Sequence, residues 1–127
     1  MGEWRYFPNM TVTIFHNPAC GTSRNTLALL REKGLDPVVV EYLKAGWSVP
    51  QLEGLLKKGG LSARDILRVR GTPAEELGLT DPKTTDAAIL TAMTQHPNLV
   101  ERPIVETDDG VVLARPMERV LALVNPK

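Results

Sequence analysis

The chain has a single cysteine among its 127 residues. One cysteine excludes a framework of disulfides within the chain, and it fits a reducing compartment better than an oxidising one. No apolar run reaches the ~18 residues that a membrane-spanning helix needs, and residues 1–9 lack the apolar core of a signal peptide. The sequence therefore predicts a cytoplasmic protein that does not act with a membrane.

The chain also lacks net charge, because fifteen basic and fifteen acidic residues cancel. A neutral chain has no overall attraction to nucleic acid, so we expect no nucleic-acid partner, and any anion site must be local. One cysteine and two histidines far apart in the sequence do not make a usual zinc-ligand set. We therefore expect no metal site.

The length and the 43% hydrophobic content fit one domain with one core. Residues 1–10 are set apart as an N-terminal extension, either native or non-native, because Met10 stands directly before the first strand-like run. Residues 11–127 are predicted to form a single domain. Its middle part, about residues 48–97, reads as a series of short helices between strands.

Short β-branched and apolar runs predict the strands, and capping residues predict the helices. The expected strands are 11–15, 38–42, 103–107 and 111–115, the last two forming a hairpin. The expected helices are 22–33, short ones starting near Ser48, Ser62, Thr72 and Thr84 or Thr85, and a last one from Pro116. The order β-α-β, helices, β-β-α is that of a thioredoxin-like α/β domain with a mixed sheet. The helical insertion lies between its second and third strands.

Cys20 stands where the first predicted strand gives way to the first predicted helix. Free backbone N–H groups and the positive end of the helix dipole favour a thiolate there, and the thiolate is the nucleophilic form. With no second cysteine, a thiol from another molecule must restore the sulfur after any reaction. The competing interpretation is that Cys20 is a small buried hydrophobic residue.

Several motifs together resemble the glutaredoxin-coupled arsenate reductases over about residues 11–124. They are HNPACGTSRNTL from His16, DILR ending at Arg68, QHPNLVERPIV from Gln95, and LARP around Arg115. The resemblance implies a thioredoxin-like fold with a helical insertion. It also implies reduction of arsenate to arsenite, with glutathione as co-substrate, glutaredoxin as protein partner and no bound cofactor.

The resemblance implies roles for a cysteine and three arginines. Cys20 matches the nucleophile that forms a covalent adduct with arsenate, which glutathione and glutaredoxin then resolve. Arg68, Arg102 and Arg115 match arginines that bind the oxyanion and the arsenic adduct. An arginine suits this task because its planar fork donates two parallel hydrogen bonds and stays protonated. Such a cluster would reconcile a neutral chain with an anionic substrate.

Other residues around Cys20 are expected to support it. The resemblance implies that His16 influences the cysteine and that Pro103 is a cis proline facing it. Ser23 either donates to the sulfur or is an ordinary hydroxyl in the first helical turn. Asn17 is expected to shape the loop or to donate to the anion.

Three other functions compete with arsenate reduction. A binding module of the same fold that regulates RNA polymerase would fit the fold, but its redox-regulated members carry C-x-x-C, where this chain has Ser23. A general glutathione-dependent thiol oxidoreductase would not need the three arginines. The phosphatase-like class of arsenate reductase needs an arginine six positions after the cysteine, where this chain has Thr26.

Overall fold

The computed structural model describes residues 11–124, so the predicted extension at residues 1–10 lies outside the described part of the chain. The described residues form two compact units. The sheet unit comprises residues 11–41 and 102–124, and the helical unit is Tyr42–Glu101. The single domain with an insertion at about 48–97 stays a prediction, and each unit is described by itself.

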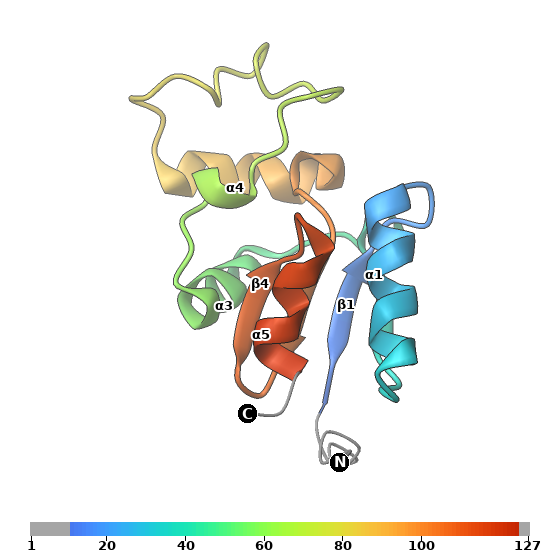
Figure 1. Ribbon diagram of the computed structural model, residues 1–127. Coiled ribbons are helices and arrows are strands. Elements are labelled where there is room, and N and C mark those ends of the chain that lie inside the picture. Colours follow the sequence, from blue (N-terminus) through green and yellow to red (C-terminus); the bar gives the residue numbers. More distant parts are fainter. Residues whose placement is uncertain (1–10, 125–127) are drawn as a thin grey trace. The chain divides into compact units, whose positions relative to one another are not determined.

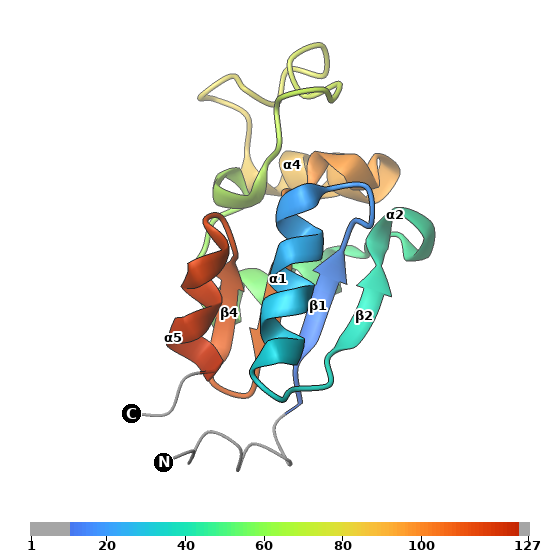
Figure 2. The ribbon, with the colours of Figure 1, turned by 45° about the vertical axis from the view of Figure 1, so that its right-hand side comes forward.

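The sheet unit is built on a four-stranded mixed sheet with the order β2-β1-β3-β4. Its strands are β1 (Thr13–His16), β2 (Val38–Glu41), β3 (Ile104–Thr107) and β4 (Gly110–Leu113). The β1–β2 pair is parallel, whereas β3 runs antiparallel to both β1 and β4. The predicted βαβ unit, the predicted hairpin and the α/β class are confirmed (Figure 2).

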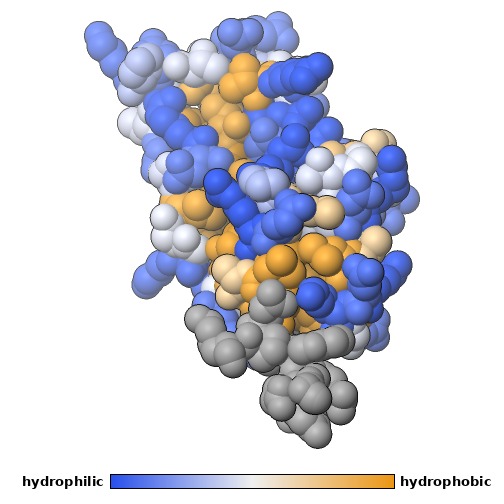
Figure 3. All heavy atoms as spheres, viewed as in Figure 1, coloured by the Kyte–Doolittle hydropathy of each residue, from blue (hydrophilic) through white to orange (hydrophobic). Residues whose placement is uncertain are grey.

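One face of this sheet is covered by α1 (Gly21–Glu32) and by α5 (Leu121–Val124), as both ribbon views show (Figure 1). Leu30 of α1, Ile14 of β1 and Val105 of β3 are fully buried in the core between the layers. Apolar side chains also gather between α1 and α5 on the visible face (Figure 3). Burial of such side chains is worth roughly 1.5–3 kcal/mol each, so this core fixes α1 on the sheet.

The last helix differs from its prediction. A 3-10 turn, η4 (Met117–Val120), comes before α5, and Pro116 lies at the N-cap of that turn. The first strand is also shifted, because it begins at Thr13 and continues to His16. His16 therefore belongs to the sheet and its side chain is buried.

The helical unit contains α2 (Tyr42–Ala45), α3 (Val49–Gly59), η2 (Arg64–Ile66), α4 (Asp86–Gln95) and η3 (Pro97–Leu99). The predicted capping box of α3 is present, with Ser48 and Gln51 bonded to each other's backbone N–H. Thr85 is the N-cap of α4 and accepts from the Ala88 N–H. None of the helices within residues 11–124 has both the length and the apolar character needed to span a bilayer.

Two predictions for the helical unit are wrong. The helix expected from Thr72 is a series of turns, because Gly71 and Gly78 both take left-handed φ angles, of 75° and 76°. The backbone bonds between these glycines close separate turns, among them the bond from the Leu77 N–H to the Pro73 carbonyl at 3.0 Å. Tyr42, expected at the end of the second strand, instead begins α2, and its ring is fully buried.

Candidate functional site

The register of the sheet brings three segments to one edge of the sheet unit. Strand β1 ends at His16, and Phe15 pairs with Ile104 of β3. Ile104 also pairs with Leu113 of β4. The loop after β1, the chain before β3 and the chain after β4 therefore meet, and these segments carry Cys20, Arg102 and Arg115.

Cys20 is the N-cap residue of α1, with extended backbone angles of −97° and 122°. Its N–H donates to the Asn17 carbonyl at 3.0 Å, and its own carbonyl accepts from the Arg24 N–H at 3.0 Å. The Cys20 side chain is partly exposed. The predicted position at a strand-to-helix junction is confirmed, and the first turn of α1 presents its N–H groups there.

Ser23 and Asn17 shape the loop that carries Cys20. The Ser23 hydroxyl is fully buried, lies 2.7 Å from His16 Nδ1 and accepts from the Asn17 N–H at 3.1 Å. The Asn17 side-chain oxygen accepts from the Ala19 N–H at 2.9 Å. Ser23 is therefore a buried link between strand and loop, a role that sequence reasoning did not anticipate.

Arg24 also binds this loop. Its Nη1 donates to the Pro18 carbonyl at 2.9 Å, so an exposed arginine on α1 holds the chain two residues before Cys20. The sequence could not predict this contact, because a hydrogen bond to a backbone carbonyl can form whatever the side chain of the accepting residue is.

The hairpin brings two of the predicted arginines together. Ala114 donates to the Pro103 carbonyl at 2.9 Å, which extends the β3–β4 ladder by one pair. Beyond it, Arg115 Nη1 donates to the Arg102 carbonyl at 3.1 Å and lies 4.0 Å from Cys20 Sγ. The Arg102–Pro103 peptide bond is cis, as the resemblance implied.

The surroundings of Cys20 favour its thiolate. Burial raises the pKa of the thiol, but a hydrogen bond from Arg102, the N–H groups of Ser23 and Thr22, and the charge of Arg102 lower the pKa below its ordinary value. Arg115 Nη1 stands at the limit of a hydrogen bond to sulfur, so we assign the guanidinium effect to Arg102. The result is a nucleophile with a larger thiolate fraction near neutral pH than an ordinary cysteine has.

His16 is placed to act on Ser23 through Nδ1. Burial lowers the pKa of His16 most, while the Glu41 carboxylate raises it and the charges of Arg24 and Arg31 lower it. The net pKa is below the ordinary value, so the ring is neutral at physiological pH.

Arg68, the third predicted arginine, belongs to the helical unit. Its N–H donates to the Leu99 carbonyl at 2.7 Å, and its Nη1 forms an ion pair with Glu101 at 2.8 Å. The side chains of Arg68 and Glu101 are 19% and 22% exposed. A guanidinium has five N–H donors, so this pair leaves donors of Arg68 available to an anion.

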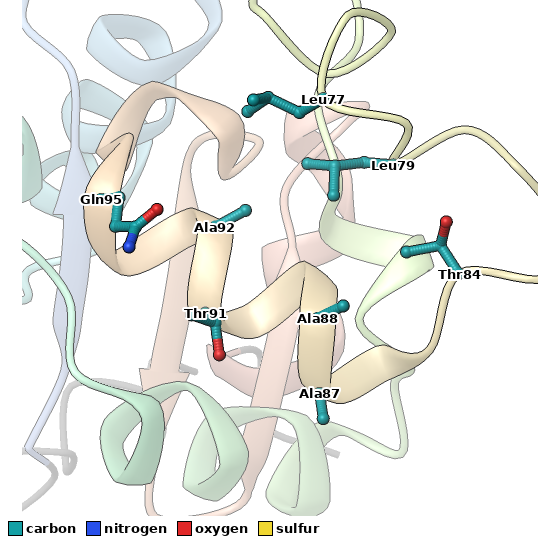
Figure 4. Close-up of a pocket in the computed structure, with 8 residues that line it drawn as sticks. All are labelled: Leu77, Leu79, Thr84, Ala87, Ala88, Thr91, Ala92 and Gln95. Carbon is teal, nitrogen blue, oxygen red and sulfur yellow. The ribbon is translucent and has the colours of Figure 1, made fainter.

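The helical unit also contains an apolar groove of about 450 Å³ (Figure 4). Small and apolar side chains of α4 and of the segment before it line the groove: Leu77, Leu79, Thr84, Ala87, Ala88, Thr91, Ala92 and Gln95. It has no nucleophilic thiol and no ionisable lining residue, so it does not supply the chemistry. In the described part of the chain, no group of His, Cys, Asp and Glu side chains is arranged to hold a metal ion.

Known proteins resemble this chain in both sequence and structure. A model of the ArsC family matches residues 15–123. The chain is 54% identical over 112 residues to an arsenate reductase of Rhizobium meliloti (strain 1021), covering 88% of this chain and 80% of the relative. It is 46% identical over 112 residues to an arsenate reductase of Escherichia coli (strain K12), covering 88% and 79%.

Solved structures agree with these relatives. The fold matches the arsenate reductase from Vibrio cholerae with a TM-score of 0.85 and 42% sequence identity, over 89% of this chain and 97% of the other. The predicted thioredoxin-like α/β fold is confirmed.

Proposed function

Because this chain belongs to the ArsC family, we propose that it is an oxidoreductase that reduces arsenate to arsenite through a covalent adduct on Cys20. The observation that carries the proposal is the thiol at the start of α1, whose pKa is lowered by Arg102 and the first helical turn. A thiolate aimed at an oxyanion needs such a setting, because the sulfur and the substrate are both negative.

The two arginines of the hairpin would neutralise the substrate. Arg102 Nε is buried and has no hydrogen-bond partner among residues 11–124. A buried donor without a partner costs about 1–3 kcal/mol, and an arsenate oxygen would remove that cost. Arg115 is fixed by its bond to the Arg102 carbonyl, so it would present its remaining donors without losing much side-chain entropy.

The proposed reduction proceeds in four steps. The Cys20 thiolate attacks arsenic, and an arsenate oxygen leaves as water after protonation. Glutathione then adds its sulfur to the arsenic and displaces a second oxygen as water. A glutaredoxin thiolate attacks the glutathione sulfur, forming a mixed disulfide, and the electron pair of the broken sulfur–arsenic bond reduces arsenic from +5 to +3. Water releases arsenite and restores Cys20.

Glutathione and glutaredoxin enter this proposal because the chain has no resolving cysteine of its own. Electrons must therefore come from an external thiol, which a reducing cytoplasm supplies. We propose this compartment as the site of action.

We propose, as the sequence resemblance implies, that Arg68 of the helical unit binds the oxyanion or the arsenic adduct. His16, Asn17 and Ser23 would hold the Cys20 loop in its reactive shape, and the hydrogen bonds among them support this role. The cis Pro103 would shape the backbone that presents Arg102.

The test is arsenate-dependent NADPH consumption in the presence of glutathione, glutaredoxin and glutathione reductase. We expect turnover that requires arsenate, glutathione and glutaredoxin together, with arsenite as the product by speciation of arsenic. Turnover of a model glutathione mixed disulfide without arsenate turnover would instead favour a general thiol oxidoreductase. Binding to RNA polymerase with neither activity would favour the regulator.

A further inference from the structure

Glu41 and His16 form the last pair of the parallel β1–β2 ladder. Residues in register on neighbouring parallel strands project to the same face of the sheet. His16 Nδ1 lies 2.7 Å from Ser23 of α1, so this face is the one that α1 covers. The register therefore places the Glu41 side chain on the same face of the sheet as the imidazole, whose Nδ1 lies against the Ser23 hydroxyl.

The bonds of Ser23 limit where the imidazole proton sits. A serine hydroxyl has one proton to donate and two lone pairs. One lone pair of Ser23 accepts from the Asn17 N–H at 3.1 Å. If the hydroxyl proton goes to His16 Nδ1, the ring must carry its own proton on Nε2. If Nδ1 is protonated instead, Ser23 accepts twice and its proton needs another acceptor.

The charges around His16 come from two elements. Glu41 is on β2, whereas Arg24 and Arg31 are on α1. Burial lowers the pKa of the ring most, and Glu41 is the one group among these three whose charge raises this pKa. A carboxylate beside a histidine commonly selects which nitrogen holds the proton.

We propose that Glu41 is a positioning residue that holds the neutral His16 ring in the Nε2-protonated form, so that Ser23 donates to Nδ1 and fixes the Asn17 N–H in the Cys20 loop. Glu41 touches neither substrate nor sulfur in this role. The consequence for catalysis rests on the proposed arsenate reduction, but the placement of the proton does not.

The structural test is ¹⁵N NMR of the full chain, since the shifts of the two ring nitrogens report which one is protonated. The chain has two histidines, so His96 serves as an internal reference. We expect Nε2 of His16 to be protonated in the wild type. Glu41→Gln should increase the Nδ1-protonated form and lower the pKa of His16, because it removes the group that raises this pKa. Unchanged ring shifts and an unchanged His16 titration in this variant would overturn the proposal.

Glu32→Gln is the matched control, because it makes the same change of charge on α1 at an exposed position that does not contribute to the His16 pKa. It should leave the His16 shifts as they are in the wild type. A response equal to that of Glu41→Gln would mean that net charge, and not the Glu41 position, controls the ring, and it would also overturn the proposal.

The kinetic test separates this role from the proposed function. Glu41→Gln should lower kcat/KM for arsenate roughly two- to five-fold, the range of a partly exposed charge pair. In a His16→Asn background it should have no further effect. An equal loss in both backgrounds would overturn action through His16, as would unchanged activity in Glu41→Gln. If the wild type shows no arsenate turnover but Glu41→Gln still shifts the His16 proton, the proposed function fails while the proton placement stands.

Discussion

The Arg115 guanidinium lies 4.0 Å from the Cys20 sulfur, although 95 positions separate the two residues in the sequence. Strand register produces this proximity. The ladder that pairs Ile104 with Leu113 continues through Pro103 and Ala114, and Arg102 and Arg115 follow at its open end. Two Arg-Pro pairs that bracket a hairpin therefore become neighbours beside the start of α1.

Replacing the nucleophile should stop the reaction and leave the fold in place. Cys20→Ser keeps the size and the N-cap geometry, since serine is a favoured N-cap residue. We expect arsenate turnover to fall roughly a thousand-fold or more, as for other nucleophile replacements. The coupled NADPH assay measures this loss, and circular dichroism checks the fold. Residual activity near the wild-type level would refute a covalent role for Cys20.

The stability difference between the wild type and Cys20→Ser should depend on pH. The folded pKa of Cys20 is below the ordinary 9.0 that the unfolded chain retains. The native state therefore binds fewer protons in the window between these two values. The thiolate's contribution to stability is fully present above pH 9.0 and is lost as the pH falls through the folded pKa. In urea unfolding, the stability difference between wild type and Cys20→Ser should thus favour the wild type more at alkaline pH than at pH 6. A difference that does not vary with pH would contradict the lowered pKa.

Replacing Arg102 and replacing Arg115 should have different effects on the pKa of Cys20. Arg102→Ala removes the hydrogen bond and the charge that lower the pKa of Cys20, so this pKa should rise. Alkylation by iodoacetamide should then need a higher pH, because only the thiolate reacts. Arg115→Ala should shift the alkylation profile less, since its Nη1 lies at 4.0 Å from the sulfur, but it should raise KM for arsenate. The reverse order of the two pKa effects would reassign the partner of the thiolate.

The sequence was sufficient for much of the sheet unit. Short β-branched runs and the order of elements predicted a mixed sheet, and the position of Cys20 predicted a thiol at the start of α1. These features depend on local pattern and on topology, which are readable from one chain. The arginines were predicted as site residues only through the motif resemblance. Their spacing along the chain does not by itself show which of them lie near Cys20.

Other features depended on tertiary contacts that have no local pattern. The bond from Arg24 to the Pro18 carbonyl and the pairing of His16 with Glu41 follow from helix packing and strand register. The segment from Thr72 has a helix-start sequence, but two glycines with left-handed φ angles confine it to turns. Tyr42 reads as a strand residue by propensity, yet burial of its ring in the helical unit places it in α2.

Ser23 should prove structural in a measurable way. Its buried hydroxyl is shared by His16 Nδ1 and the Asn17 N–H. Ser23→Ala leaves a buried N–H and a ring nitrogen without this partner, which should cost about 1–3 kcal/mol in the free energy of unfolding. Thr94→Ala is the control, since Thr94 donates to the Thr91 carbonyl on an exposed part of α4 and should cost less than about 0.5 kcal/mol. If urea titrations gave Ser23→Ala and Thr94→Ala the same loss in the free energy of unfolding, the buried Ser23 bonds would stabilise the chain no more than the exposed Thr94 bond does.

Two arginines of the helical unit should differ, because Arg64 supports the structure and Arg68 is proposed to support turnover. Arg64 donates to the carbonyls of Leu79, Asp81 and Thr84, and so it closes the segment before α4. Arg64→Ala should destabilise the chain by roughly 2 kcal/mol, because several charged hydrogen bonds to backbone are lost. The kcat/KM of the folded fraction should remain close to that of the wild type.

Arg68→Ala should behave in the opposite way. Its ion pair with Glu101 is partly exposed, so its loss should cost at most about 1 kcal/mol in stability. If Arg68 binds the oxyanion or its adduct, kcat/KM for arsenate should fall about 10- to 100-fold, and Arg68→Lys should recover only part of it because lysine lacks the planar fork. Steady-state kinetics at saturating glutathione and glutaredoxin measure the loss, with urea unfolding of the same samples. A stable Arg68→Ala variant with wild-type kcat/KM would mean that Arg68 does not bind the oxyanion or its adduct.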